Sequence, residues 1–334
     1  MIPSQLRHAL DRAETVLCIS HVSPDGDALG SLLGMGHLLT ALGKRPTLAL
    51  HDKVPADFFF LPGAETIISP EQVGGDYDLI VVLDASSSDR MGDVYRRDAH
   101  RAIPMLVIDH HITNTNFGQI NWVDPSCAAA CQMLVLLADE MNMPLSQNIA
   151  ICLLTGLVTD TLCFRTPNTD ARVLEAAMRL VDAGADLANI AARTVNSLPI
   201  RVFNLWGQVF PHIGFEDGVI WAPVSLVNRW AAGVGPGEDG SLSSKLIMAN
   251  EADISATFVE KIDEKGEAVV ECSFRAKPGF DVAQLALSYG GGGHPPAAGC
   301  TIKGELYAVT ERVVADLRTL RRNIMAARNE QTKA

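Results

Sequence analysis

Carboxylate and imidazole side chains gather in one short stretch near the start of the chain. The segment "HVSPDGDALGS", residues 21–31, places His21, Asp25 and Asp27 directly after the apolar run "TVLCIS". Oxygen ligands from aspartate and nitrogen ligands from histidine, without thiolate, suit hard or borderline divalent cations. These residue types predict that the segment helps to bind metal.

Three later segments carry the same side-chain types. Asp84 ends the run "DLIVVLD", Asp109, His110 and His111 end "IPMLVIDHH", and Asp160 ends "ICLLTGLVTD". In an open parallel sheet, ligands bind at the carboxyl ends of the strands, so residues just past each strand share one crevice. The combination predicts a site for two divalent cations.

Each segment also has an ordinary structural interpretation. "PDGD" is a good turn sequence, an aspartate before a helix is commonly an N-cap, and paired histidines are often solvated. "DGD" also resembles part of a calcium loop, but the further EF-hand ligands are missing. Four segments that converge on one crevice are harder to explain as caps and turns than any one of them.

The pattern of apolar runs indicates how these segments are positioned. Strand-like runs "TVLCIS", "RPTLAL", "DLIVVLD" and "IPMLVID" alternate with helical stretches such as residues 28–42. This alternation is typical of an α/β fold with a doubly wound, mostly parallel sheet and helices on both faces. Helices dominate from about residue 127 to 210.

The pattern changes again near residue 218. "GVIWAPVSL", "DISATFVEKI" and "EAVVECSFRA" are expected to be strands, which indicates a second, smaller α/β domain. We therefore expect a metal-binding domain at residues 1–195, a helical linker at 196–215 and a substrate-binding domain at 216–334.

A glycine-rich segment lies in this second part. "SYGGGGHPPAAGC", residues 288–300, places four glycines before His294 and two prolines after it. Glycine lets the backbone approach an anion closely, and imidazole can donate to a phosphate oxygen. The alternative is a flexible turn. A Walker A loop is excluded because no Gly-Lys-Ser/Thr follows.

Composition limits the classes of function. The chain has 334 residues, 48% of them hydrophobic, and no apolar run reaches the ~20 residues that span a bilayer. Its net charge of −12 argues against coating long nucleic acid, although a short anionic substrate remains compatible if metal is bound. Seven scattered cysteines fit reduced thiols, so we expect a cytoplasmic protein with no membrane partner.

Five segments together resemble a known family. "HVSPDGDALGS", "VVLDASSSDR", "VIDHHITN", "LLTGLVTDT" and "GGGGHPPAAG", in this order, resemble the four motifs of the DHH phosphoesterase family and its DHH-associated C-terminal domain. The similarity extends from about residue 12 to residue 320. Within the family, the chain resembles the nanoRNase type, which combines oligoribonuclease and pAp phosphatase activities.

The resemblance implies a set of metal ligands. One ion is expected on His21, Asp25 and Asp84. The second is expected on the bridging Asp84 together with Asp27, His110 and Asp160. Two such ions would activate a shared water for attack on phosphorus. Manganese (Mn²⁺) is the family expectation, while magnesium, cobalt and zinc remain open.

The resemblance also implies supporting residues. Asp109 is expected to orient the histidines, and His111 to contact the phosphate or stabilise the site. In the second domain, the resemblance implies that Gly291, Gly292, Gly293 and His294 bind phosphate. Arg275, in "CSFRAK", is a further candidate, for a bidentate contact with a terminal phosphate. Arg90 could also hold phosphate, with an ordinary surface arginine as the alternative. The active site would lie in the cleft between the domains.

The activity implied is metal-dependent hydrolysis of short oligoribonucleotides to mononucleotides, together with hydrolysis of pAp or linear dinucleotides such as pApA. Short RNA and small nucleotide phosphates would be the partners, and a homodimer is a family-level expectation. The alternatives are a RecJ-like single-strand exonuclease, a cyclic-dinucleotide phosphodiesterase, a family-II inorganic pyrophosphatase and a nucleotide-sensing binding protein.

Overall fold

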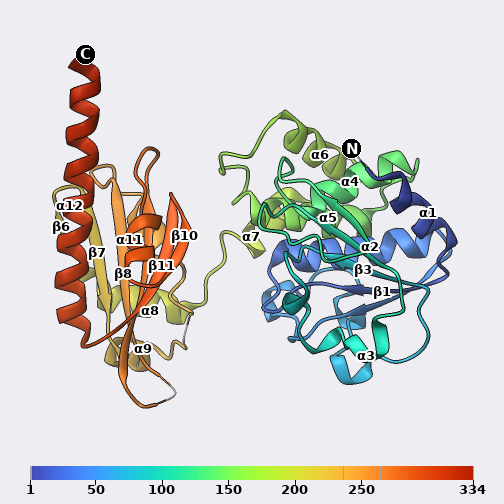
Figure 1. The fold of residues 1–334 in the computed structure, drawn as a ribbon, viewed down its shortest axis with the longest axis horizontal. Helices are drawn as coiled ribbons and strands as arrows, with labels where there is room; N and C mark the ends of the chain where they lie inside the picture. The colour runs from blue at the N-terminus through green and yellow to red at the C-terminus, as the bar shows by residue number, and fades with distance from the viewer. Residues whose placement is uncertain (1, 236, 264, 334) are drawn as a thin grey trace. The chain divides into compact units, whose positions relative to one another are not determined.

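The chain folds into two compact units, Met1–Ser197 and Leu198–Ala334. The computed structural model describes residues 2–235, 237–263 and 265–333. Each unit has its own sheet and its own core (Figure 1). The predicted linker at 196–215 contains helix α8 (Ile200–Val209), which the structure groups with the second unit.

The first unit is built on a five-stranded sheet in the order β2-β1-β3-β4-β5, in which every pair is parallel. The strands are β1 (Thr15–Ile19), β2 (Arg45–Ala49), β3 (Leu79–Leu83), β4 (Met105–Asp109) and β5 (Ile120–Val123). β3 and β4 are buried along their whole length, as expected for strands covered on both faces. The predicted α/β fold is confirmed.

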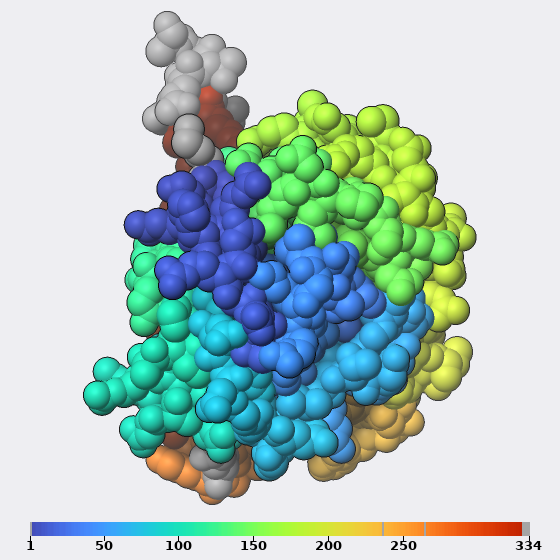
Figure 2. Space-filling model, turned by 90° about the vertical axis from the view of Figure 1, so that its right-hand side faces the viewer, coloured from blue at the N-terminus to red at the C-terminus, as the bar shows by residue number. Residues whose placement is uncertain are grey.

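Helices and short turns cover the two faces of this sheet. The helices are α1 (Ser4–Arg12), α2 (Gly26–Ala41), α3 (Arg97–His100), α4 (Ala130–Glu140), α5 (Gln147–Asp160), α6 (Ala171–Asp182) and α7 (Leu187–Arg193). α2, α4 and α5 form the larger core on one face, and a smaller core on the other face includes Met91 and Val94. α1 lies at the surface, where it buries Leu6 and Leu10 (Figure 2).

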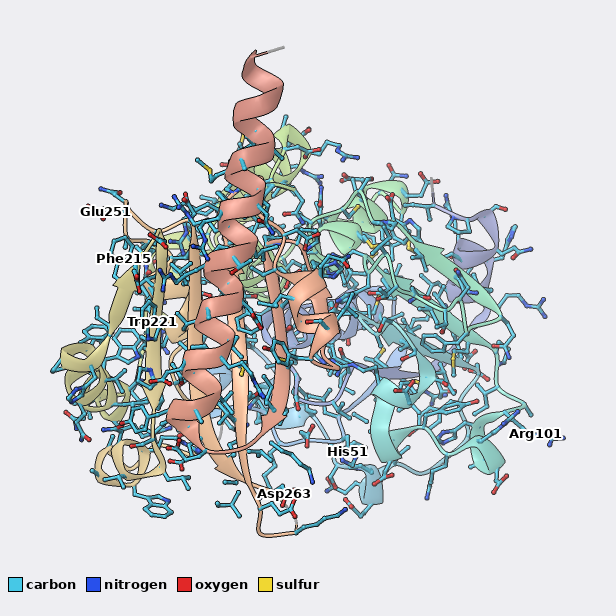
Figure 3. The ribbon with its side chains drawn as sticks, turned by 60° about the vertical axis from the view of Figure 1, so that its left-hand side comes forward. His51, Arg101, Phe215, Trp221, Glu251 and Asp263 are labelled. Carbon is cyan, nitrogen blue, oxygen red and sulfur yellow. The ribbon has the colours of Figure 1, made fainter. Side chains whose placement is uncertain are left out.

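The second unit has a six-stranded mixed sheet in the order β10-β11-β9-β8-β7-β6. Its strands are β6 (Gly214–Glu216), β7 (Val219–Val224), β8 (Ile254–Ile262), β9 (Ala268–Ala276), β10 (Gly292–His294) and β11 (Ala297–Lys303). Only the β7–β8 pair is parallel among the described strands of this sheet. Phe215 and Trp221 mark the neighbouring strands β6 and β7 in Figure 3.

The two faces of the second sheet differ in character. The long helix α12 (Leu306–Lys333) covers the face that carries Cys272 and Phe274 (Figure 3). Residues with the opposite orientation on β9, such as Ser273 and Arg275, are only partly buried. The remaining helices of this unit are α9 (Leu226–Ala232), α10 (Leu242–Leu246) and α11 (Ala283–Ser288). No helix in the described ranges is long and apolar enough to cross a membrane.

Candidate metal centre

The sheet of the first unit brings the predicted ligands to one edge. His21 follows β1, Asp84 follows β3 and His110 follows β4, so all three lie at the carboxyl ends of neighbouring parallel strands. Asp27 joins them from the first turn of α2, and Asp160 from the last residue of α5. Three groups of side chains here could each hold a metal ion.

The first group consists of His21, Asp25 and Asp84. The Nε2 atom of His21 lies 3.8 Å from Asp25 Oδ1 and 3.5 Å from Asp84 Oδ2. The three ligand atoms lie within 4.8 Å of one another. This spacing is compatible with one cation drawn between them, after small side-chain movements.

The second group is centred on His110. Its Nε2 atom lies 3.3 Å from Asp160 Oδ2, 3.4 Å from Asp84 Oδ1 and 3.8 Å from Asp27 Oδ2. Asp84 therefore turns Oδ2 toward the first group and Oδ1 toward the second. One carboxylate that faces two groups is the arrangement a bridging ligand requires.

Asp84 is buried and has one side-chain oxygen without a hydrogen bond among the described residues. Its side chain is 2% exposed, and Oδ1 has no hydrogen-bond partner among the described residues. Its backbone has φ of 55°, an uncommon conformation that costs energy for a residue other than glycine. A buried carboxylate oxygen that lacks a hydrogen bond and lies among histidines fits a bound cation. The residues present therefore fit the metal ions that the sequence predicts.

Asp27 is fixed by a helix distant in sequence. Its Oδ2 accepts from the backbone N–H of Ala130 at 2.6 Å, and its Oδ1 from that of Cys131 at 2.9 Å. These are the first N–H groups of α4, which has no side-chain cap of its own. A Cβ on Gly156 would lie 2.6 Å from Asp27 Oδ1, so the absence of a side chain there makes room for the carboxylate.

Asp25 performs the structural role that its position suggests. Its Oδ1 accepts from the backbone N–H groups of Asp27 and Ala28, both at 3.0 Å, and thereby caps α2. The cap holds the carboxylate close to His21. The N-cap interpretation and the ligand interpretation of "PDGD" are therefore compatible.

The contacts of His21 favour Nε2 as its free nitrogen. Its Nδ1 lies 2.7 Å from the carbonyl oxygen of Val22 and 3.0 Å from Nη2 of Arg90. If Nδ1–H donates to Val22, Nε2 keeps its lone pair for a metal ion. Arg90 Nη2 then cannot donate to this nitrogen, and its proton is available to another acceptor at the site.

Asp109 and His111 form a supporting pair. His111 Nδ1 lies 2.8 Å from Asp109 Oδ1 and 3.6 Å from Asp84 Oδ1. The third possible metal group consists of Asp84, His110 and His111. A metal ion on His111 Nδ1 would have to replace the hydrogen bond between His111 and Asp109. Asn114 donates to Asp109 Oδ2 at 2.6 Å. Burial would raise the pKa of Asp109, but the hydrogen bonds from His111 and Asn114 outweigh it and lower the pKa.

Sequence reasoning missed Asn114, although it lies within the quoted segment "VIDHHITN". Its type and its position five residues after Asp109 were the available signal. It also missed the backbone contacts of Asp27, for which the sequence offers no local signal, because the partners are 103 and 104 residues away.

Crowded carboxylates dominate the electrostatics of the centre. Burial and the nearby Asp84 raise the pKa of Asp27 to about 7, and burial and the nearby Asp27 raise the pKa of Asp160 to about 9. Burial alone would lower the pKa of His21 and of His110, but the surrounding carboxylates outweigh it and raise both to about 10. A bound cation would relieve this repulsion and displace these protons.

The predicted phosphate-binding residues other than Arg90 lie in the second unit. His294 on β10 pairs with Ala297, which pairs with Arg275 on β9, so the register places His294 and Arg275 in one row across the sheet. His294 is exposed, and Arg275 Nε donates to Ser244 Oγ at 3.1 Å. The backbone of Gly291 lies close to β11, since a Cβ on Gly291 would lie 2.1 Å from the carbonyl oxygen of Gly299.

Models of two protein families match the chain. The DHH family, N-terminal domain, matches residues 15–157, and the DHHA1 domain matches residues 224–321. The first match includes every candidate ligand except Asp160, and the second includes Arg275 and His294.

Two relatives and a solved structure match nearly the whole chain. The bifunctional oligoribonuclease and PAP phosphatase NrnA of Thermus thermophilus is 35% identical over 90% of this chain and 88% of its own length. The protein of the same name from Bacillus subtilis is 26% identical over 95% of this chain and 98% of its own length. An exopolyphosphatase-related protein from Bacteroides fragilis, 22% identical, shares the fold with a TM-score of 0.84 over 95% of this chain and 96% of its own. The chain therefore belongs to the DHH phosphoesterase family and carries a C-terminal DHHA1 domain.

Proposed function

We propose that the chain hydrolyses short oligoribonucleotides to mononucleotides, and also pAp or linear dinucleotides such as pApA, with two divalent metal ions. The observation that carries the proposal is Asp84, whose two oxygens face two separate His/Asp groups and whose buried Oδ1 has no hydrogen-bond partner among the described residues. The oligoribonuclease and PAP phosphatase names of the Thermus and Bacillus relatives support the substrate class.

The first unit holds the reacting centre in this proposal. His21, Asp25 and Asp84 would hold one ion, and Asp84, Asp27, His110 and Asp160 the other. Two bound cations would lower the pKa of a shared water and stabilise charge on the phosphoryl oxygens. The mixed nitrogen and oxygen ligands favour Mn²⁺, with Mg²⁺ and Co²⁺ as alternatives.

The protein's own groups would orient substrate around that centre. With its Nδ1–H donating to Asp109, a protonated His111 presents Nε2–H as a donor for a phosphate oxygen. Arg90 Nη2, close to His21, would contribute a second donor. In the second unit, Arg275 and His294 would bind a further phosphate group of the substrate.

Cleavage of a labelled RNA ladder tests the proposal. Oligoribonucleotides of two to twenty-four nucleotides with Mn²⁺, beside pAp and pyrophosphate, should show rates that fall steeply above about five nucleotides, with pAp also consumed, because an acidic chain has little to hold a long strand. Efficient degradation of the longest strands would instead indicate a RecJ-like exonuclease. Tight nucleotide binding without hydrolysis at any metal would indicate a sensor.

A further inference from the structure

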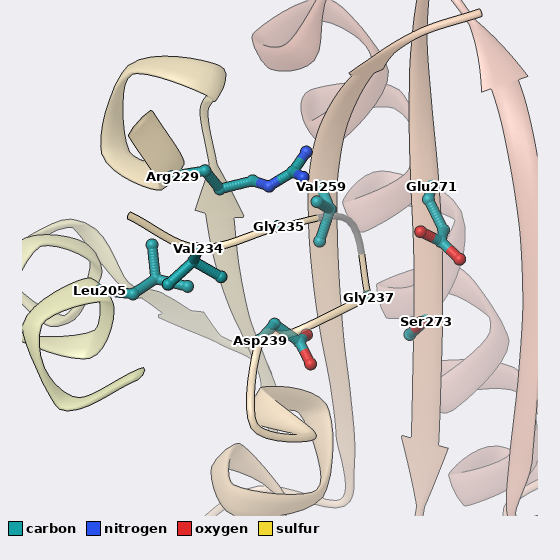
Figure 4. Close-up of a pocket in the computed structure, with 9 residues that line it drawn as sticks. All are labelled: Leu205, Arg229, Val234, Gly235, Gly237, Asp239, Val259, Glu271 and Ser273. Carbon is teal, nitrogen blue, oxygen red and sulfur yellow. The ribbon is translucent and has the colours of Figure 1, made fainter. Parts of the chain in front are cut away.

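A small cavity in the second unit lies on the face of the sheet opposite α12. Its volume is about 120 Å³. Figure 4 shows polar side chains reaching toward it from separate segments. The polar lining residues are Arg229 on α9, Asp239 on the following loop, and Glu271 and Ser273 on β9.

Arg229 is a buried cation with few partners. The residue is 5% exposed, and its Nη1 donates to the carbonyl oxygen of Glu260 at 3.0 Å. Among the described residues, the Glu260 carbonyl is the one hydrogen-bond acceptor of its guanidinium, and no carboxylate forms a salt bridge with that group. A guanidinium has five N–H donors, and leaving a buried charge without acceptors is costly. Arg229 therefore has donors available for a ligand in the cavity.

Acceptors line another wall of the cavity. Asp239 is partly buried, its Oδ1 accepts from the backbone N–H of Ser241 at 2.9 Å, and burial raises its pKa. Glu271 is already engaged in an ion pair with Lys261. Asp239 is thus the carboxylate best able to accept a hydrogen bond from a ligand.

The neighbouring strand leaves one more polar atom unpaired. Thr257 pairs with Ser273 in the sheet register, and its buried Oγ1 has no hydrogen-bond partner among the described residues. Buried hydroxyls without partners are uncommon. This part of the sheet therefore has hydrogen-bonding capacity that the protein itself does not use.

The position and size of the cavity indicate what could enter it. Arg275 lies two residues beyond Ser273 on the same face of β9, about 7 Å along the strand. A cavity of about 150 Å³ accommodates a benzene ring, so one of 120 Å³ can take the edge of a single base but not a whole nucleoside. A base in the cavity would leave its phosphate near Arg275.

We propose that this cavity recognises guanine. Arg229 donates to O6 of the base, and Asp239 accepts from N1–H and the exocyclic amino group, all three on the Watson–Crick edge. Adenine presents an amino group where guanine presents O6, so it would place donor against donor at Arg229. The inference rests on the proposed function, because it assumes that the substrate is a nucleotide.

The test compares four dinucleotides, pGpG, pApA, pUpU and pCpC, with Mn²⁺. We expect kcat/KM for pGpG to exceed the other three by about tenfold or more. Arg229→Met and, separately, Asp239→Asn should abolish that preference by lowering kcat/KM for pGpG. Arg322→Met, at an exposed arginine of α12, is the matched control and should keep the preference.

Two results would contradict guanine recognition by this cavity. One is equal kcat/KM for all four substrates in the wild type, and the other is a guanine preference that survives in a folded Asp239→Asn protein. The conservative Asp239→Asn variant decides the matter if Arg229→Met does not fold.

Calorimetry with GMP and AMP distinguishes the guanine pocket from the proposed hydrolytic function. Tighter binding of GMP without hydrolysis of any dinucleotide would support the pocket and contradict the proposed function. Hydrolysis without base preference would support the proposed function and contradict the pocket.

Discussion

The two units of the chain treat their charged side chains differently. In the first unit, the candidate ligands Asp27 and Asp84 are 0% and 2% exposed. In the second unit, His294 is exposed and Arg275 is only partly buried. The first unit carries 13 lysines and arginines against 23 aspartates and glutamates, whereas the second carries 14 against 16. The acidic excess lies almost entirely in the unit with the candidate metal centre.

This difference suits the two units to different roles, metal binding in the first and substrate binding in the second. Buried carboxylates repel one another, and a bound cation would relieve this repulsion, so the His/Asp groups of the first unit are suited to binding metal. Partly exposed cations cost little to keep in water and gain from contact with phosphate, so the second unit is suited to holding substrate. We therefore expect changes in the first unit to act on turnover, and changes in the second to act on substrate affinity.

The largest expected effect comes from Asp84→Asn. The asparagine tolerates the positive φ of this position but cannot bridge two cations. We expect kcat to fall about 10³-fold or more, which corresponds to about 4 kcal/mol of transition-state stabilisation. Asp93→Asn, at an exposed carboxylate of the same unit, is the control. Near-normal turnover in Asp84→Asn would contradict the mechanism.

A smaller effect, of a different kind, is expected from Arg275→Met. Loss of a charge-assisted hydrogen bond to phosphate should raise KM about 10- to 100-fold and leave kcat within a few-fold. Steady-state kinetics on pAp and on a dinucleotide measure both constants, with Arg322→Met as the control. A loss confined to kcat would break the proposed division between the units.

Asn114→Ala tests the support of the centre. Asp109 would lose the donor at 2.6 Å and hold His111 less firmly, so the affinity for Mn²⁺ or kcat/KM should fall about tenfold. The same side chain donates to the carbonyl oxygen of Ala85, so the melting temperature must be compared as well. Asn196→Ala, at an exposed asparagine, is the control. Unchanged activity and affinity would show that Asp109 does not depend on this contact.

The smallest effect concerns stability alone. Asp78 Oδ2 accepts from the backbone N–H groups of Thr15 and Glu14, both at 2.9 Å, and these bonds lower its pKa. Because the pKa is lower in the folded state, this stabilisation is present above the unfolded pKa of about 3.9 and is lost as the pH falls through the folded pKa. The melting-temperature difference between wild type and Asp78→Asn should shrink as the pH falls below about 4. A constant difference from pH 6 to pH 2.5 would contradict this assignment.

The ends of the parallel strands were the predictable part of the centre. The apolar runs "DLIVVLD" and "IPMLVID" contain β3 and β4, and the rule that parallel strands present their carboxyl ends at one edge brings Asp84 and His110 together. Their roles as ligands remain predictions. Features that depend only on local pattern and sheet geometry can be inferred from one sequence.

Contacts made across the fold were not predictable in this way. The N-terminus of α4 fixes Asp27, and Gly156 of α5 makes room for it, which depends on how three helices pack. β5 and β10 were also missed, since "INWV" is short and "GGH" has little intrinsic preference for a strand. These features arise from tertiary packing, which a local pattern does not encode.

Counting bound metal tests the central claim most directly. Titration of the metal-free protein with Mn²⁺, followed by calorimetry and electron paramagnetic resonance, should give two ions per wild-type chain. His21→Ala should retain one ion, in the group centred on His110, and Asp84→Asn should weaken both. A fully active wild-type protein with one ion per chain, or a His21→Ala protein that still binds two with unchanged affinity, would contradict a two-metal centre bridged by Asp84.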